Sequence, residues 1–338
     1  MVNKNTKYRC KIPLAAFSAC IVFALIQFAA WHSRTFWINV DRYAEPFKDD
    51  QIRFSATIKL AQASGDPRKL VALIGSSQVR EGIDAKFLNA SDPTHVYLNL
   101  GLSGSAPPLE MFMRSSEFLA AKPASVYYFI YVGSLFSEYR YSKLKEGFSP
   151  AIIPFIIQDL GAMEIWFNRS YYIQSLAGQV LPFYRFRDSL LRIFEKRAQD
   201  FLDKRDRAPN YYNFSQSQPP DYFKQQIEKH RTNLFRPNRF ESLNVTLLTE
   251  LIQKVRLSHA KFILVESPVH PLFTNTVSQK VLDTYRDVLA KVISDNSLDY
   301  IGTELLPKFD SDDFIDFTHL NSNGRSKLTK YILKSNQS

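Results

Sequence analysis

The sequence predicts a three-layer α/β domain, in which helices cover both faces of a parallel sheet. Five short runs are apolar without the alternation that marks a half-exposed strand, so they suit strands buried on both faces. Helical patterns separate most of these runs, as in βαβ units. Of the 338 residues, 45% are hydrophobic and 22% are charged, which excludes global disorder.

The predicted strands and helices alternate from residue 69 to the end of the chain. β-Branched and aromatic residues fill the strand runs, and the helical stretches carry apolar residues at helical spacing. The strands are predicted at 69–75, 95–101, 125–132 and 261–266, with a weaker fifth at 298–302. The helices are predicted at 107–121, 243–258, 278–296 and 323–335.

Residues 140–242 interrupt this alternation and predict a helical insertion between the third and fourth strands. Aromatic and basic residues share its faces, as at 183–187, and apolar residues run at helical spacing over 190–202. Basic residues outnumber acidic ones here, in a chain whose net charge is +10. The insertion is interpreted either as a solvated helical lid or as a surface that meets lipid headgroups, an anionic polymer or a membrane partner.

The N-terminus predicts a membrane anchor. Four cations and no acidic residue precede residue 12, and residues 13–31 carry no charge. A helix of that length spans about 28 Å, close to the hydrocarbon thickness of a bilayer. Trp31 and Trp37 suit an aromatic belt at its far end, and the cations place the N-terminus in the cytoplasm. A cleaved signal peptide and a lipoprotein signal ending at Cys20 are the alternatives.

These features predict four regions and no prosthetic group. The regions are a cytoplasmic tail (1–11), a transmembrane anchor (12–31), a membrane-proximal segment (32–68) and an extracytoplasmic domain (69–338). The two cysteines, Cys10 and Cys20, precede the domain, so it has no disulfide, thiol nucleophile or Cys-based zinc site. No His-Glu-x-x-His or phosphate-loop spacing occurs. We therefore expect no metal, no cofactor and, outside the cell, no nucleic-acid partner.

Three short motifs carry the candidate chemistry. Gly75-Ser-Ser77 follows the first strand, and a serine on such a tight turn exposes its hydroxyl beside the N-terminus of the next helix. Asn99-Leu-Gly-Leu-Ser-Gly104 follows the second strand, where a glycine backbone can approach a ligand and donate to an oxyanion. Asp316-Phe-Thr-His319 precedes the last helix, and its carboxylate can orient the imidazole as a base.

Each motif is weak by itself, because a glycine after a strand often only terminates it and an Asp often only caps a turn. Their combination is stronger. All three lie where the carboxyl ends of parallel strands place loops at one edge of the sheet, which is the usual ligand edge of an open α/β sheet.

Together the motifs resemble blocks I, II and V of the SGNH (GDSL-like) hydrolase superfamily. The resemblance covers roughly residues 69–335 without the insertion, and the terminal Asp-x-x-His is its most specific part. It implies a flavodoxin-like sheet, Ser77 as the nucleophile, His319 as the general base and Asp316 as its orienting partner. It also implies an oxyanion hole formed by the N–H groups of Ser77 and Gly104.

The chain departs from the family pattern after the third strand. Family hydrolases carry Gly-x-Asn-Asp there, and a donor such as that Asn is worth about 2.7–4 kcal/mol of transition-state stabilisation. This chain has Val132-Gly-Ser134-Leu-Phe instead. Either Ser134 or a backbone N–H takes that place, or the reaction differs from fast hydrolysis. The departure and the anchor resemble membrane-anchored proteins of D-alanyl-lipoteichoic-acid transfer and SGNH-like polysaccharide O-acetyltransferases, which commonly work beside a membrane-bound O-acyltransferase.

This resemblance implies an extracytoplasmic serine acyltransferase that O-acylates, and in the simplest case O-acetylates, a cell-envelope or exported polysaccharide through an acyl-enzyme at Ser77. A carbohydrate esterase and a non-catalytic accessory protein of an envelope acylation complex are the alternatives. Asn99, Ser134 and His270 lie at or after strand ends and are candidates for substrate contact. Arg80, one helical turn after Ser77, either meets an anionic substrate or lies on a solvated helix face.

Overall fold

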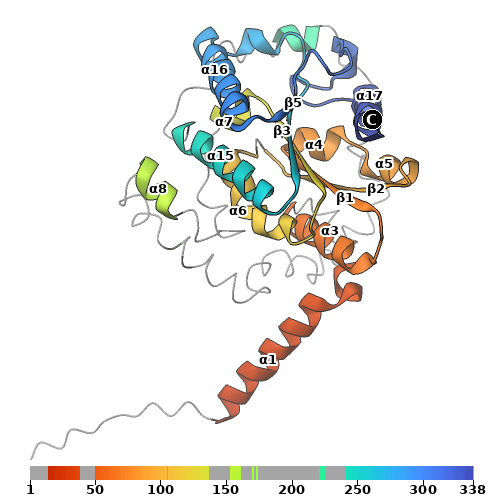
Figure 1. The fold of residues 1–338 in the computed structure, drawn as a ribbon, viewed down its shortest axis with the longest axis vertical. Helices are drawn as coiled ribbons and strands as arrows, with labels where there is room; N and C mark the ends of the chain where they lie inside the picture. The colour runs from red at the N-terminus through yellow and green to blue at the C-terminus, as the bar shows by residue number, and fades with distance from the viewer. Residues whose placement is uncertain are drawn as a thin grey trace, which may run out of the picture.

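A five-stranded parallel sheet forms the centre of the protein (Figure 1). The structure, a computed structural model, describes residues 14–38, 50–104, 106–136, 153–160, 170, 173, 221–225 and 241–337. The strand order β2-β1-β3-β4-β5 is the flavodoxin-like order, and it confirms the predicted α/β class with a parallel sheet. The strands are β1 (Lys69–Gly75), β2 (His95–Gly101), β3 (Ser125–Ile130), β4 (Lys261–Glu266) and β5 (Asp299–Ile301).

Helices cover both faces of this sheet, which confirms the three-layer arrangement (Figure 1). One layer consists of three helices that pack together over β1 and β2: α4 (Ser77–Gly82), α5 (Ala85–Ser91) and α17 (Ser322–Gln337). The opposite layer consists of four helices: α3 (Asp50–Ser64), α6 (Pro108–Leu119), α15 (Glu241–Leu257) and α16 (Gln279–Asn296). Two short 3-10 helices, η5 (Phe273–Thr276) and η6 (Ser311–Asp313), lie in the loops after β4 and β5.

The strands are apolar because both faces of the sheet are covered. Every residue of β3 is buried, including Tyr128, which is fully buried with its hydroxyl donating to the Ala106 carbonyl at 3.0 Å. Tyr97 of β2 is also buried, and its hydroxyl donates to Asp92 Oδ2 at 2.7 Å. Each tyrosine fills volume and keeps its polar end bonded. The high aromatic content of the sequence therefore serves the core of the sheet.

β3 ends two residues earlier than the sequence predicted, because the chain turns at once into α7 (Val132–Phe136). The hydroxyl of Ser134 accepts the Tyr131 N–H at 3.3 Å, and the Ser134 N–H donates to the Tyr131 carbonyl at 2.8 Å. These bonds close the first turn of α7 and stop the strand.

α3 is an element that the sequence analysis missed. Its residues were assigned to a membrane-proximal segment, but the helix packs on β2 with Phe54 and Ile58 fully buried. The Arg53 guanidinium donates to the carbonyl oxygens of Asn99, at 3.0 Å, and Gly101. The packed domain therefore begins before residue 69.

The N-terminal helix α1 (Leu14–His32) carries large apolar side chains that are 45–65% exposed. They are Ile21, Val22, Phe23, Leu25, Ile26 and Phe28. Trp37, predicted for an exposed aromatic belt, is instead buried, with 2% of its surface exposed.

Across the parts of the chain that the structure describes, no helix combines the length and the apolar character needed to cross a membrane.

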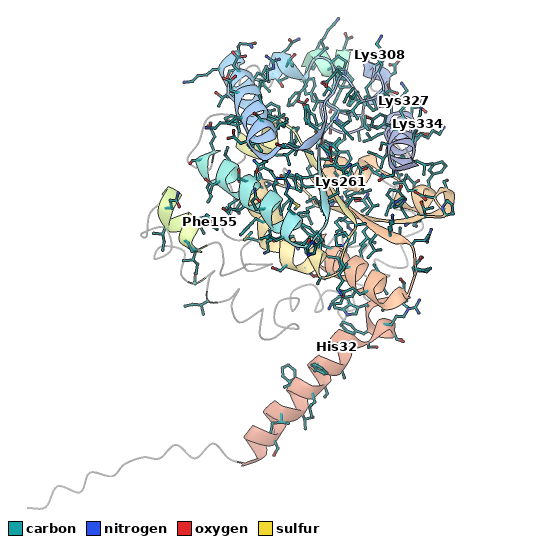
Figure 2. The ribbon with its side chains drawn as sticks, in the orientation of Figure 1. His32, Phe155, Lys261, Lys308, Lys327 and Lys334 are labelled. Carbon is teal, nitrogen blue, oxygen red and sulfur yellow. The ribbon has the colours of Figure 1, made fainter. Side chains whose placement is uncertain are left out.

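Two pieces of the predicted insertion are described. α8 (Ile153–Leu160) packs on α15, and its Phe155 meets Phe112 of α6 edge-to-face with ring centroids 5.8 Å apart (Figure 2). The second piece, residues 221–225, is helical. The predicted helix at 190–202 and the basic aromatic stretch at 183–187 lie outside the described residues.

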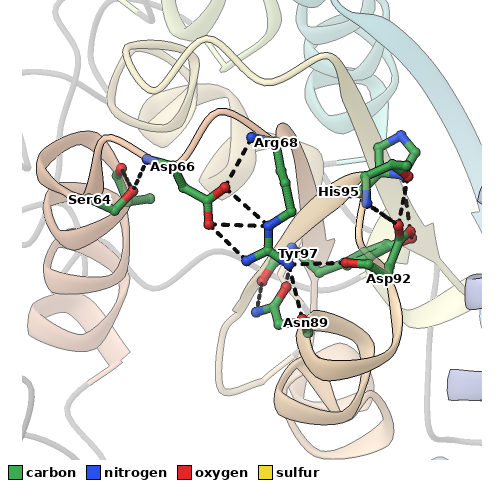
Figure 3. A network of polar contacts seen from close by, with 9 residues as sticks. Ser64, Asp66, Arg68, Asn89, Asp92, His95 and Tyr97 are labelled. Carbon is green, nitrogen blue, oxygen red and sulfur yellow. Dashed lines mark hydrogen bonds and ion pairs between the residues drawn. The ribbon is translucent and has the colours of Figure 1, made fainter.

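A polar network fastens the amino ends of β1 and β2, at the edge of the sheet away from the candidate motifs (Figure 3). The Arg68 guanidinium is paired with Asp66 at 2.8 Å and donates to the carbonyl oxygens of Asn89 and Asp92, both at 3.0 Å. The Asp92 side chain in turn bonds to His95, at 3.0 Å, and to Tyr97. This network closes the loop between α5 and β2.

Candidate active site

Ser77 is the first residue of α4, directly after β1. The turn needs a glycine at position 75: φ there is +151°, and a Cβ would lie 2.7 Å from Val79 Cγ2 and 2.9 Å from the Phe129 carbonyl oxygen. Ser76 caps the helix, because its hydroxyl accepts the Gln78 N–H at 3.1 Å. Ser77 is thereby fixed at the carboxyl end of β1.

The end of β2 holds the other side of α4. A Cβ on Gly101 would lie 2.3 Å from the backbone nitrogen of Arg80, so only glycine lets the helix come this close. The Asn99 amide donates to three carbonyl oxygens at the end of α4, those of Val79 at 2.9 Å, Arg80 at 3.3 Å and Ile83 at 3.0 Å. The Asn99 amide, predicted to contact substrate, is used here to hold α4.

The structure brings together the three residues predicted for catalysis. Ser77 Oγ lies 2.7 Å from His319 Nε2, and His319 Nδ1 lies 2.8 Å from Asp316 Oδ2. The other carboxylate oxygen of Asp316 accepts the N–H groups of Thr318 and His319, both at 2.8 Å. The carboxylate thus fixes the imidazole through its own turn and directs Nε2 toward the serine. This is the geometry of an activated serine nucleophile.

The electrostatics of the pair favour an imidazole that accepts a proton. Burial opposes the charged imidazolium, but the hydrogen bond and charge of Asp316 outweigh it and raise the pKa of His319 above its usual value. Burial likewise opposes the Asp316 carboxylate, yet the bonds from His319 and Thr318 lower the pKa of Asp316. The surroundings of Asp316 therefore favour its ionised form.

The predicted oxyanion hole differs from the expectation. Ser77 and Gly104 are adjacent, but the Ser77 N–H donates to the Gly104 carbonyl oxygen at 3.4 Å. This N–H is one of the two groups predicted to donate to an oxyanion, and here the Gly104 carbonyl oxygen accepts it. Gly104 has a φ of +86°, a conformation that favours glycine, so the glycine requirement at this position is real. For the Ser77 N–H to donate to an oxyanion, the Gly104 carbonyl would have to release it.

The remaining candidate residues take supporting positions. Ser134 is fully buried, and its hydroxyl oxygen accepts the Tyr131 N–H. His270 is also buried, with 1% of its surface exposed, beneath the Asp316–His319 loop; its N–H donates to the Phe317 carbonyl at 2.9 Å. Both residues, predicted to contact substrate, are buried in this structure.

Arg80 and Glu81 form an ion pair beside the imidazole of His319. Each side chain is 14% exposed, and the charges of both act on His319. Arg80 also donates to the hydroxyl of Ser103, in the loop that contains Gly104. Arg80 is thus neither on a solvated helix face nor available as an isolated cation for an anionic substrate.

Sequence reasoning missed the contribution of residues 221–225 to this site. Phe223 is 4% exposed and stacks on His270, and burial together with the charge of Asp316 raises the pKa of the neighbouring Tyr222. No spacing in the sequence relates these residues to Asp316. The aromatic character of the insertion was the one available signal.

Within the described residues, no group of three His, Cys, Asp or Glu side chains is placed to hold a metal ion.

The chain matches no family model and no curated protein. Among solved structures, one described as a "putative acylhydrolase" from Bacteroides fragilis NCTC 9343 is similar with a TM-score of 0.39 and 10% sequence identity, over 81% of this chain and 91% of that one. A likeness of this degree carries no conclusion about function.

Proposed function

We propose that this protein is a serine acyltransferase that works through an acyl ester on Ser77. The observation that carries the proposal is the hydrogen-bonded series from Ser77 Oγ to His319 Nε2, 2.7 Å, and from His319 Nδ1 to Asp316, 2.8 Å. A serine is a weak nucleophile at its free pKa, and an adjacent oriented base activates it. The series supplies such a base at hydrogen-bonding distance.

The proposed reaction has two halves. In the first, His319 takes the Ser77 proton while Oγ attacks the acyl donor; the Ser77–acyl bond forms, and the leaving group departs with that proton. In the second, His319 takes the proton of an acceptor hydroxyl, which attacks the ester. The Ser77–acyl bond then breaks and Oγ recovers a proton from His319.

The substrate class rests on the resemblance of the motifs rather than on the geometry. A polysaccharide hydroxyl of the cell envelope is the proposed acceptor, and acetyl is the simplest acyl group. A membrane-bound O-acyltransferase is the proposed partner that delivers the acyl group. The Gly104 carbonyl that accepts the Ser77 N–H supports a site that is completed on meeting substrate or partner.

The hydrogen bond from the Ser77 N–H to the Gly104 carbonyl also favours one further candidate. This candidate is a non-catalytic accessory protein that uses the scaffold to bind polymer or partner. This candidate and the acyltransferase differ in one respect: only the acyltransferase needs the Ser77 hydroxyl.

Labelling with a fluorophosphonate tests the chemistry. The full-length protein in membranes, Ser77→Ala and His319→Ala are treated in parallel, and their intact masses are measured. One adduct on the wild type, absent from both variants, is the expected result. No adduct on the wild type would contradict an activated serine and leave the accessory role.

Acceptor dependence separates transfer from hydrolysis. Unlabelled protein from a preparation that reacts with the fluorophosphonate is given a chromogenic acetyl ester, with and without a soluble oligosaccharide. For a transferase, we expect acetylated oligosaccharide and an ester cleavage rate that rises with acceptor concentration. A cleavage rate that does not change with acceptor concentration would instead identify an esterase.

We also propose that the N-terminal segment attaches the protein to a membrane, with the α/β domain on the extracytoplasmic side. The exposed apolar side chains of α1 support this attachment. The test places lysine at two of them, Val22→Lys with Ile26→Lys, and compares extraction from membranes by alkaline carbonate. The wild type should stay with the membranes and the double variant should be released. Leu257→Lys, at an exposed leucine of α15, is the control that should behave as wild type.

A further inference from the structure

An aromatic stack joins the insertion to the loop that carries His319. Phe223, from residues 221–225, lies over the imidazole of His270, with ring centroids 3.8 Å apart and planes at 16°. Its ring also meets Phe317, at 5.7 Å between centroids. Phe317 lies between Asp316 and His319 in the chain. The insertion therefore reaches the catalytic loop through two aromatic contacts.

His270 is tied to the same loop by its backbone and its ring. Its backbone N–H donates to the Phe317 carbonyl at 2.9 Å. Its ring packs edge-to-face on the rings of Phe314 and Phe317, with centroids 5.5 and 5.7 Å apart. His270 Nδ1 accepts the Leu272 N–H at 3.1 Å, so the neutral ring carries its proton on Nε2. Nε2 is buried and, within the described part of the chain, has no hydrogen-bond partner. The imidazole thus packs here as a neutral aromatic ring.

The contacts with His270 add to the bonds that the catalytic loop makes within itself. Its own bonds close it on itself, since the Ile315 N–H donates to the His319 carbonyl at 2.9 Å and the Asn321 N–H to the Asp313 carbonyl at 2.8 Å. These bonds fix the shape of the loop and not its distance from Ser77, which stands on the rigid end of β1. His270 follows β4 of the same sheet, so contacts with His270 connect the loop to the sheet.

We propose that Phe223 and His270 are positioning residues, which hold the Asp316–His319 loop at reacting distance from Ser77. The inference rests on the proposed function and adds that the insertion completes the active site. Any partner that moves the insertion would then act on the serine through Phe223. A displacement of about 1 Å between reacting groups can cost about 100-fold in rate, so a single stack is sufficient to control the site.

The test measures the rate of fluorophosphonate labelling of Ser77 as a function of pH in full-length variants. Phe223→Ala and Phe223→Leu remove the stack, and the leucine keeps apolar volume so that the protein stays folded. Phe223→Tyr keeps the stack. Phe155→Ala is the matched control, since Phe155 is another aromatic residue of the insertion packed on the core, at α6 and away from the site.

We expect Phe223→Ala and Phe223→Leu to label about tenfold or more slowly, with the pH midpoint shifted downward as His319 loses the ordered Asp316 contact. Phe223→Tyr and Phe155→Ala should label within about twofold of the wild type, at an unchanged midpoint. Equal losses in Phe223→Leu and Phe155→Ala would overturn the proposal, because they would reflect a general loosening of the insertion. A wild-type rate in Phe223→Ala would overturn it as well.

A second readout does not depend on activity. The chain has six histidines, and their imidazole resonances can be titrated by NMR. Burial lowers the pKa of His270 to about 4, so loss of Phe223 should raise that pKa toward its usual value and lower the pKa of His319. If the pKa values of His270 and His319 both shift but the wild type is never labelled, the proposed function is wrong and the positioning role of Phe223 is supported. If neither pKa shifts, the positioning role of Phe223 is contradicted, whatever the labelling rates show.

Discussion

Two segments of this chain share the pattern Asp-x-Thr-His, and both form the same turn. In Asp92–His95, one carboxylate oxygen accepts the N–H groups of Thr94 and His95 at 2.8 and 3.1 Å, and the other lies 3.0 Å from His95 Nδ1. The corresponding distances in Asp316–His319 are 2.8, 2.8 and 2.8 Å. The turn therefore orients an imidazole wherever it occurs. The candidate active site is distinguished by the serine opposite His319.

The two histidines give a matched pair of variants. His319→Ala should reduce the labelling rate of Ser77 by about 100- to 10,000-fold, the usual contribution of a general base. His95→Ala removes an imidazole from the same kind of turn at the opposite edge of the sheet and should leave the labelling rate unchanged. Comparable losses in both variants would indicate that the turns act on folding rather than on the serine.

The pH dependence of labelling should report the Asp316–His319 pair. Because the carboxylate raises the pKa of His319, the wild-type rate should increase with pH through a midpoint above the usual histidine value of about 6.5. In Asp316→Asn the charge is gone while burial remains, so the midpoint should fall below that value and the maximal rate should drop. A midpoint that stays in place after Asp316→Asn would contradict the assigned partner.

At the scale of the element, the short helix α4 is held by contacts from two strands. Gly75 allows β1 to turn into it, Gly101 allows the end of β2 to touch it, and the Asn99 amide binds its terminal carbonyl oxygens. Ser77 is the first residue of this helix. Its position therefore depends on residues of β1 and β2 that hold α4 in place.

Alanine variants of two glycines distinguish the effect of close backbone packing against α4 from the effect of helix propensity. Gly101→Ala places a Cβ 2.3 Å from the Arg80 nitrogen, so we expect a loss of about 1–3 kcal/mol in the free energy of unfolding and a strong loss of labelling as α4 moves. Gly82→Ala is the control, because its Cβ would find only ordinary contacts, the nearest at 3.7 Å from Leu320. Urea unfolding and labelling rates check both, and a neutral Gly101→Ala would refute the close-packing argument.

At the scale of the whole molecule, opposite edges of the sheet have different roles. The carboxyl edge holds the Ser77–His319–Asp316 series, and the amino edge holds the Asp66–Arg68 and Asp92–His95 contacts (Figure 3). Stability and reactivity can therefore be altered separately.

Acid should destabilise the protein by protonating Asp92, at the amino edge of the sheet. Burial opposes the Asp92 carboxylate, but bonds from Thr94, Tyr97 and His95 outweigh burial and lower the pKa of Asp92 well below its usual value. A lowered pKa contributes stability that is present above about pH 4 and is lost as the pH falls below it. Asp92→Asn should thus lower the free energy of unfolding by about 1–3 kcal/mol at pH 7 and weaken its dependence on pH below 4. Urea titrations between pH 2 and 7 check this, with the neutral-pH labelling rate expected to remain at the wild-type level while the variant is folded.

The sequence alone was sufficient for the strands and for the pairing of motifs. Strands buried on both faces are continuous apolar runs, and the ends of parallel strands share an edge, so the order of motifs along the chain placed all three at one edge of the sheet. The resemblance of the motifs to the SGNH superfamily then implied that Ser77, His319 and Asp316 would pair. α3 escaped detection because its role depends on Arg53 reaching two carbonyl groups of β2, which no local pattern encodes.

Only the tertiary structure decided which polar residues serve the site and which serve the fold. Asn99, Ser134 and His270 all lie at strand ends on the predicted ligand edge, yet their bonds go to α4, to α7 and to the catalytic loop. Phe223 reaches that loop from an insertion far away in the chain. A sequence specifies local geometry through short-range sterics and hydrogen bonds, as in the two Asp-x-Thr-His turns. Whether such a turn faces a serine or a structural tyrosine depends on packing between distant elements, which appears only when the chain is folded.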